Sequence, residues 1–89
     1  MTSSLANIRV GDPLTDAELE VLRLAANGLG CMAIAARHHI AYQTAKSRLA
    51  RIKRKLGART LAHAVSLAIR SRQIHPREIE PTDAIRSMT

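Results

Sequence analysis

Residues 42–57, which read YQTAKSRLARIKRKLG, decide the fold of this chain. Apolar side chains recur in this stretch at spacings of four, three and four residues, at Ala45, Leu49, Ile52 and Leu56. Such spacing is typical of one face of an α-helix, and Gly57 follows as a left-handed terminator. The stretch therefore predicts a helix over residues 42–56 that buries one stripe and exposes a basic face.

Three further segments carry helical signals. Thr15 and Glu18 match a capping box and predict a helix over residues 16–26, ended by Asn27-Gly28. A short helix over residues 31–38 follows, and residues 39–41 form the turn to the basic helix. A fourth helix is predicted from near Thr60 to about residue 73, with an inward stripe of Leu61, Ala64, Val65, Ala68 and Ile69. The prediction is an all-α fold of four helices.

Length and composition fit one small domain. The chain has 89 residues, of which 46% are apolar and 24% charged, and its single aromatic residue leaves a core of small aliphatic side chains. We expect the domain to span residues 14–74, between a flexible lead at 1–13 and a flexible tail at 75–89. No apolar run could span a membrane and no secretory leader is recognisable, so we expect a cytoplasmic protein without a membrane partner.

Basic residues are unevenly distributed. Lys and Arg number 14 against seven Asp and Glu, a net charge of +7, and no acid lies between Glu20 and Glu78. Seven bases fall within residues 46–59, at Lys46, Arg48, Arg51, Lys53, Arg54, Lys55 and Arg59. A basic run can be no more than a solvated helix face. Without nearby acids to neutralise it, however, this cluster favours a polyanion, and nucleic acid is the first candidate.

A short helix, a three-residue turn and a long basic helix are the layout of a helix-turn-helix, whose second helix enters the major groove of DNA. The face opposite the apolar stripe carries side chains able to read base edges: Gln43, Lys46, Ser47, Ala50 and Arg51. Residues suited to phosphate contacts accompany them: Thr44, Arg48, Arg54 and Lys55. The arrangement predicts binding to double-stranded DNA.

The stretch from Leu14 to Ile74 resembles the LuxR/GerE-type DNA-binding domain of bacterial transcription regulators. The resemblance rests on the ordered motifs LTxxExEVLxL at 14–24, GL at 28–29, IA at 34–35, TxK at 44–46 and LxxIxxKLG at 49–57. It implies a four-helix fold and base contacts at the positions of Lys46, Ser47 and Ala50, with Thr44, Arg51 and Arg54 near the DNA backbone. It also implies a homodimer on a roughly two-fold symmetric operator, formed through the fourth helix at Leu61, Ala64, Val65 and Ala68.

The chain departs from this family pattern at several positions. Gly30-Cys31-Met32-Ala33 replaces a polar helix start, Ala41 replaces a Ser or Thr cap, and Ala45 replaces a larger Val. The missing cap and the smaller core residue each cost about 1 kcal/mol. Leu19, Met32 and Tyr42 could form an apolar surface patch that binds the N-terminal lead, a second subunit or a polymerase subunit, or could be scattered exposed apolar residues.

Other chemistry has little support in the sequence. The single Cys31 has no partner, the adjacent His38 and His39 point in different directions on a helix, and no nucleophile stands with a base. We therefore expect no enzyme activity, cofactor, metal or small-molecule ligand, and a stand-alone transcription regulator. Two alternatives remain: a promoter-binding module that resembles region 4 of a sigma factor and acts with RNA polymerase, and a protein-interaction module that captures another regulator.

Overall fold

The computed structural model describes residues 8–82 and 87–88. Within these ranges the chain is all-α, without strands, and its α-helices are α1 (Asp16–Ala26), α2 (Cys31–His38), α3 (Tyr42–Leu56) and α4 (Leu61–Arg70). The 3-10 turn η2 (Pro76–Glu78) follows them. The predicted fold class is confirmed, and α1, α2 and α3 begin and end where the sequence predicted. Only α4 stops earlier, at Arg70 instead of about residue 73.

Local signals account for the helix boundaries. Thr15 and Glu18 form both halves of the capping box, with the Thr15 Oγ1 accepting from the Glu18 amide at 3.1 Å and Glu18 Oε1 accepting from the Thr15 amide at 3.0 Å. Thr60 caps α4 by accepting from the His63 amide at 3.0 Å. Gly57 ends α3 at a φ of 69°, a conformation that costs glycine little.

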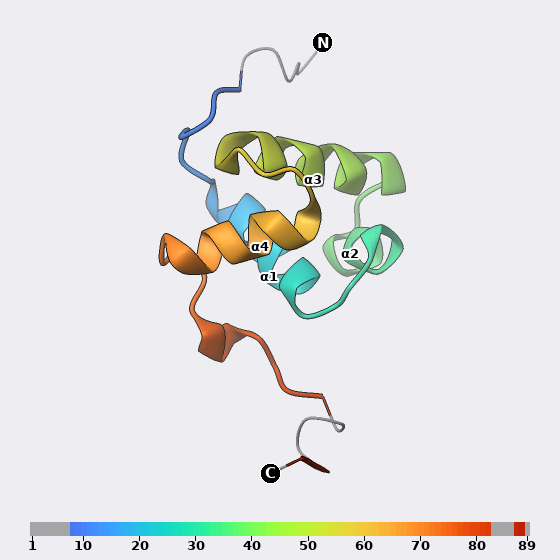
Figure 1. Ribbon diagram of the computed structural model, residues 1–89. Coiled ribbons are helices and arrows are strands. Elements are labelled where there is room, and N and C mark those ends of the chain that lie inside the picture. Colours follow the sequence, from blue (N-terminus) through green and yellow to red (C-terminus); the bar gives the residue numbers. More distant parts are fainter. Residues whose placement is uncertain (1–7, 83–86, 89) are drawn as a thin grey trace.

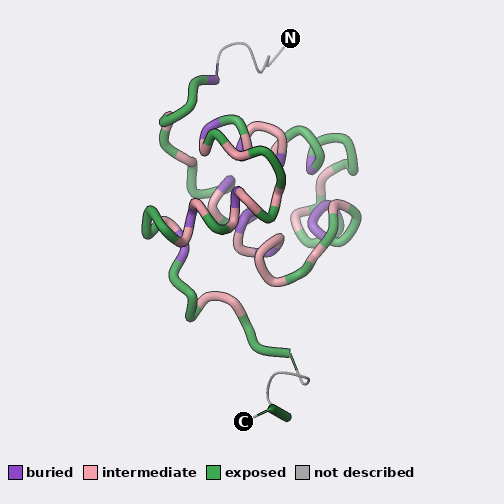
Figure 2. Tube along the Cα trace, viewed as in Figure 1, coloured by how far each residue is buried: buried purple, intermediate pink, exposed green. Residues whose placement is uncertain are grey.

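One core joins the four helices. Figure 1 shows α3 as the uppermost of the four helices, with α1, α2 and α4 beneath it. Buried positions occur where the helices face one another (Figure 2). The largest fully buried side chains come from α1, α2, α3 and the segment after α4, and are Leu22, Ile34, Ile52, Ile74 and Val21. Ile40, in the turn before α3, packs against this core.

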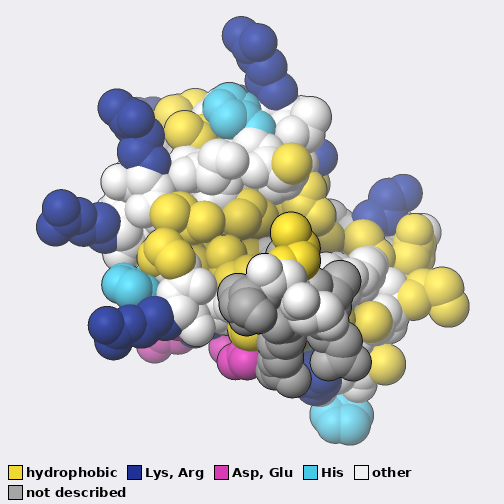
Figure 3. All heavy atoms as spheres, turned by 60° about the horizontal axis from the view of Figure 1, so that its bottom comes forward, with side chains coloured by type: hydrophobic (Ala, Val, Ile, Leu, Met, Phe, Trp, Pro, Cys, Tyr) yellow, Lys and Arg dark blue, Asp and Glu magenta, His cyan; other side chains and the backbone are white. Residues whose placement is uncertain are grey.

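The apolar stripe of α4 divides into a buried part and a surface part. Ala64 and Ala68, which we expected in a dimer interface, are fully buried inside the subunit and present no surface to a second copy. Leu61, Val65 and Ile69 are half-buried. Figure 3 shows hydrophobic side chains gathered at the centre of the face turned toward the bottom of Figure 1, with Lys and Arg projecting around its edge. The accessible apolar residues of α4 are therefore its half-buried ones and the exposed Ala62.

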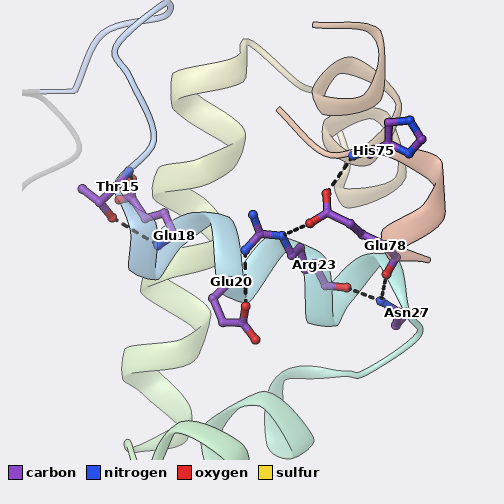
Figure 4. A network of polar contacts seen from close by, with 7 residues as sticks. All are labelled: Thr15, Glu18, Glu20, Arg23, Asn27, His75 and Glu78. Carbon is purple, nitrogen blue, oxygen red and sulfur yellow. Dashed lines mark hydrogen bonds and ion pairs between the residues drawn. The ribbon is translucent and has the colours of Figure 1, made fainter. Parts of the chain in front are cut away.

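The segment after α4 is held against the domain, which differs from the flexible tail that we expected from residue 75. Ile74 is 1% exposed. Arg23 of α1 forms an ion pair with Glu78 at 2.6 Å, and the Asn27 side chain donates to the Glu78 carbonyl at 2.9 Å (Figure 4). Asn27 also accepts from the Glu80 amide. These contacts join η2 to the C-terminal end of α1; residues 83–86 and 89 lie outside the described part of the chain.

The segment before α1 also contacts the domain, although we expected residues 1–13 to be a flexible lead. Ile8 is 6% exposed, and the Gly11 amide donates to the Lys55 carbonyl at 2.7 Å. Within the described residues, packing against the domain therefore extends N-terminal to Leu14, as far as Ile8. Residues 1–7 lie outside the described part of the chain.

Candidate nucleic-acid interface

Most of the predicted site residues that are accessible to solvent lie on the outward face of α3. Ala45, Leu49 and Ile52 are buried on the inner side of the helix. On the outer side, the following are exposed: Gln43, Thr44, Lys46, Ser47 and Arg54. Ala50, Arg48, Arg51 and Lys53 are half-buried. With the exception of Lys55, the structure places all the predicted DNA-contacting residues on the accessible part of one helix.

The turn between α2 and α3 sets the direction in which this face points. His39 ends α2 in the left-handed conformation with a φ of 55°, and the Ile40 amide donates to the Ala35 carbonyl at 2.9 Å. Ala41 then adopts the extended conformation of an N-cap but supplies no side-chain cap bond to α3. The start of α2 at Gly30 also lacks a side-chain cap. The chain thus keeps the helix-turn-helix geometry although α2 and α3 both lack a side-chain N-cap, as expected from Gly30 and Ala41.

Lys55 is not available for a phosphate, which corrects our expectation for this residue. Its side chain is 9% exposed, and its Nζ lies 2.7 Å from Glu18 Oε1 and 3.0 Å from the Pro13 carbonyl oxygen. The residue lies near the boundary between the buried and exposed sides of α3, and the packing of α1 against α3 puts a carboxylate next to it. Because the cation is already paired and largely desolvated, moving it to solvent would leave Glu18 buried without its partner.

Glu18 is a residue whose full role the sequence analysis missed. Its capping role was predictable from the sequence, but the same carboxylate also lies 3.4 Å from the Arg51 Nε. Burial raises the pKa of the Glu18 carboxyl, but hydrogen bonds from Lys55 and Thr15 and the charges of Lys55 and Arg51 outweigh it and lower the pKa below 4.5. The basic cluster is therefore partly neutralised from α1. No local signal could show this, because Glu18 and Lys55 are 37 residues apart.

The remaining cations of α3 differ in how they are held. Arg54 is exposed, but its Nε donates to the Ile8 carbonyl at 3.1 Å. Arg51 keeps 39% of its side chain exposed beside Glu18. Among the described residues, no ion pair involves Lys46, Arg48 or Lys53. The outer face of α3 therefore carries several uncompensated positive charges and no carboxylate of its own.

In the described part of the chain, no group of three or more His, Cys, Asp or Glu side chains could hold a metal ion. Cys31 is half-buried and forms no disulfide bond with another described residue. No helix in the described ranges is both long and apolar enough to cross a membrane.

Comparison with known proteins agrees with this geometry. Residues 12–68 match the family of bacterial regulatory proteins described as the luxR family, GerE. The chain is also 44% identical over 63 residues to the transcriptional activator protein BjaR1 of Bradyrhizobium diazoefficiens, an alignment that covers 71% of this chain and 26% of that protein. The chain thus spans about a quarter of the length of this curated relative. Because the family match takes in α1, α2, α3 and most of α4, the chain belongs to the luxR family of bacterial regulatory proteins.

Proposed function

We propose that the chain is the DNA-binding part of a transcription regulator and inserts α3 into the major groove of double-stranded DNA. The observation that carries this proposal is the outer face of α3, which combines exposed base-reading side chains with uncompensated positive charge. The core beneath α3 fixes the direction of that face, so that specific side chains meet specific base edges. Acting on DNA, the protein works in the cytoplasm.

The exposure of each residue suggests a division of roles. We assign base contacts to the outermost and flanking residues of α3: Gln43, Lys46, Ser47, Ala50 and Arg51. Gln43 can bridge two positions of adenine, Lys46 and Arg51 can donate to guanine, and Ala50 can contact a thymine methyl group. Phosphate contacts remain with Thr44, Arg48 and Arg54. Lys55 is removed from this set because it is paired with Glu18 in the interior.

We further propose that two copies associate through α4 on a two-fold symmetric operator. The half-buried residues Leu61 and Val65 supply the apolar contact, and Ile69 continues the same strip. Two copies related by a two-fold axis would present two α3 helices to successive major grooves on one side of the duplex. A domain this small also gains stability from covering part of its apolar surface in a dimer.

Selection of binding sites from a random duplex library at fixed salt tests the proposal, because it reports sequence preference, site symmetry and half-site spacing together. Lys46→Ala and Ser47→Ala should relax preference at particular positions. Arg54→Ala should instead weaken binding to all sequences alike. If Lys46→Ala leaves both the preferred sequence and the discrimination unchanged, α3 does not read bases.

Sedimentation of the protein with and without DNA tests the dimer. A two-fold symmetric selected site occupied by two chains is the expected result. A monomer that binds promoter DNA only beside RNA polymerase would instead favour a role like that of sigma region 4. A protein that selects no sequence but forms a stable complex with a purified regulator would favour an interaction module.

A further inference from the structure

Residues 8–12, which we call the N-terminal turn, form an ordered structure at the C-terminal end of α3 (Figure 1). The Arg9 amide donates to Asp12 Oδ2 at 2.9 Å, and the Asp12 amide donates to the Arg9 carbonyl at 3.0 Å. Gly11 adopts a φ of 96°, which a residue with a side chain rarely accepts. These two hydrogen bonds between Arg9 and Asp12 give the segment a defined turn conformation and not that of an extended linker.

Three separate contacts attach the N-terminal turn to α3. The Gly11 amide donates to the Lys55 carbonyl, the Ile8 carbonyl accepts from Arg54 Nε, and Val10 lies against Gly57. The bond to Lys55 uses a carbonyl near the C-terminal end of α3, where the helix itself leaves carbonyls without partners. Because Ile8 is also buried, the turn has a fixed place beside the helix that we assign to the major groove.

This attachment affects two arginines. Arg9 is exposed, and among the described residues no ion pair or hydrogen bond involves its guanidinium. Arg54 donates its Nε to the turn, which leaves the two terminal nitrogens of its guanidinium for another acceptor. The one acid in the turn is Asp12, and its carboxylate faces the Arg9 backbone amide. The N-terminal turn thus brings the unpaired guanidinium of Arg9 to the C-terminal end of α3. It also restricts the orientation of the Arg54 guanidinium.

We propose that the N-terminal turn is a second DNA contact, in which Arg9 binds a backbone phosphodiester beside the C-terminal end of α3 while the Ile8 carbonyl orients Arg54 toward the same strand. The inference rests on the proposed function, since it takes α3 to lie in the major groove. When the N-terminal residues of a recognition helix lie in the major groove, its C-terminal end lies near a sugar-phosphate backbone. Guanidinium groups bind the phosphates there without reading the base sequence. Residues 8–11 lie outside residues 12–68, the part of the chain that matches the family.

Binding of Arg9→Ala to a mixed-sequence duplex and to a selected duplex, measured by fluorescence anisotropy over a range of salt concentrations, tests the proposal. Each phosphate contact makes the fall of log K with log salt steeper by about 0.9. If the contact contributes nothing at 1 M salt, its loss should weaken binding about five-fold per subunit at 0.15 M salt. The loss should be equal for both duplexes and should vanish toward 1 M salt. Asp12→Asn keeps an oxygen for the Arg9 amide and removes a negative charge, so it should tighten binding.

Arg77→Ala is the matched control, because it removes the same charge from an exposed residue of η2, at the opposite end of the molecule from α3 (Figure 1). It should change affinity less than two-fold. If Arg9→Ala and Arg77→Ala weaken binding equally, or if Arg9→Ala keeps the full salt slope, the N-terminal turn does not contact DNA. That failure is separable from failure of the proposed function, in which the unaltered protein binds no duplex or Lys46→Ala leaves discrimination intact.

Discussion

The ion pair of Glu18 and Lys55 holds the end of α3 against α1, and changing Glu18→Gln tests its contribution to stability. The Lys55 Nζ and Glu18 Oε1 are 2.7 Å apart, and the two side chains are 9% and 5% exposed. At an effective dielectric constant of about 20, unit charges at this separation attract by about 6 kcal/mol. Desolvation of each ion costs several kcal/mol, so the pair as a whole is close to neutral for stability, whereas one partner left alone is costly.

Glu18→Gln removes the negative charge but keeps the acceptor, because the glutamine oxygen can still accept from Lys55 and from the Thr15 amide, as Oε1 does. It also ends the weaker ion pair of Glu18 Oε2 with Arg51, which is 39% exposed. The variant should therefore keep the cap and leave Lys55 as a buried cation without an anion. We expect it to lower the free energy of unfolding by about 3 kcal/mol, the lower end of the range for breaking a buried pair. A single domain of this size has a stability of roughly 4–11 kcal/mol, so the variant should remain measurable.

Urea unfolding followed by circular dichroism measures this loss. With a denaturant dependence of about 1 kcal/mol per molar urea, the midpoint should fall by about 3 M. Glu20→Gln is the matched control on the same helix, since Glu20 is 49% exposed and pairs with Arg23 at 3.4 Å. It should cost less than about 0.5 kcal/mol.

A second substitution distinguishes an unpaired charge from general damage. Lys55→Met in the Glu18→Gln background removes the orphaned cation and should restore most of the lost stability. The reasoning is refuted if Glu18→Gln costs less than about 1 kcal/mol, or if the two substitutions destabilise the protein additively.

Three further predictions concern pH, the cap of α3 and the C-terminal segment. Because the folded pKa of Glu18 lies below 4.5, its stabilisation is complete above the pKa of the unfolded state and is lost as pH falls through the folded value; the urea midpoint should decline below about pH 4.5, and less steeply in Glu18→Gln. Ala41→Ser should supply the missing N-cap acceptor and raise stability by about 1 kcal/mol in urea unfolding, and an unchanged midpoint would contradict this. Asn27→Ala should speed hydrogen exchange of residues 74–80 while leaving α3 protected, and equal protection in both proteins would show that these bonds do not hold the segment.

Helix positions could be predicted from the sequence because their causes are local. The four-residue spacing of Ala45 and Leu49, the Thr15 capping box and the terminator Gly57 each act within a few residues, and the structure places the corresponding helices as predicted. The exposed face of α3 was predictable for the same reason, since the period of a helix separates Gln43 and Ser47 from the buried stripe.

What the sequence by itself determined is therefore the four-helix plan and the side of α3 that faces outward. Tertiary structure alone decided which of two adjacent cations faces solvent: Arg54 is exposed, whereas Lys55 is buried against Glu18, which lies 37 residues away in the sequence. It also decided that residues 8–12 and 74–80 join the domain. The physical reason is that periodicity and capping are fixed within single helices, whereas ion pairs and docked segments depend on the angles and distances at which separate helices pack.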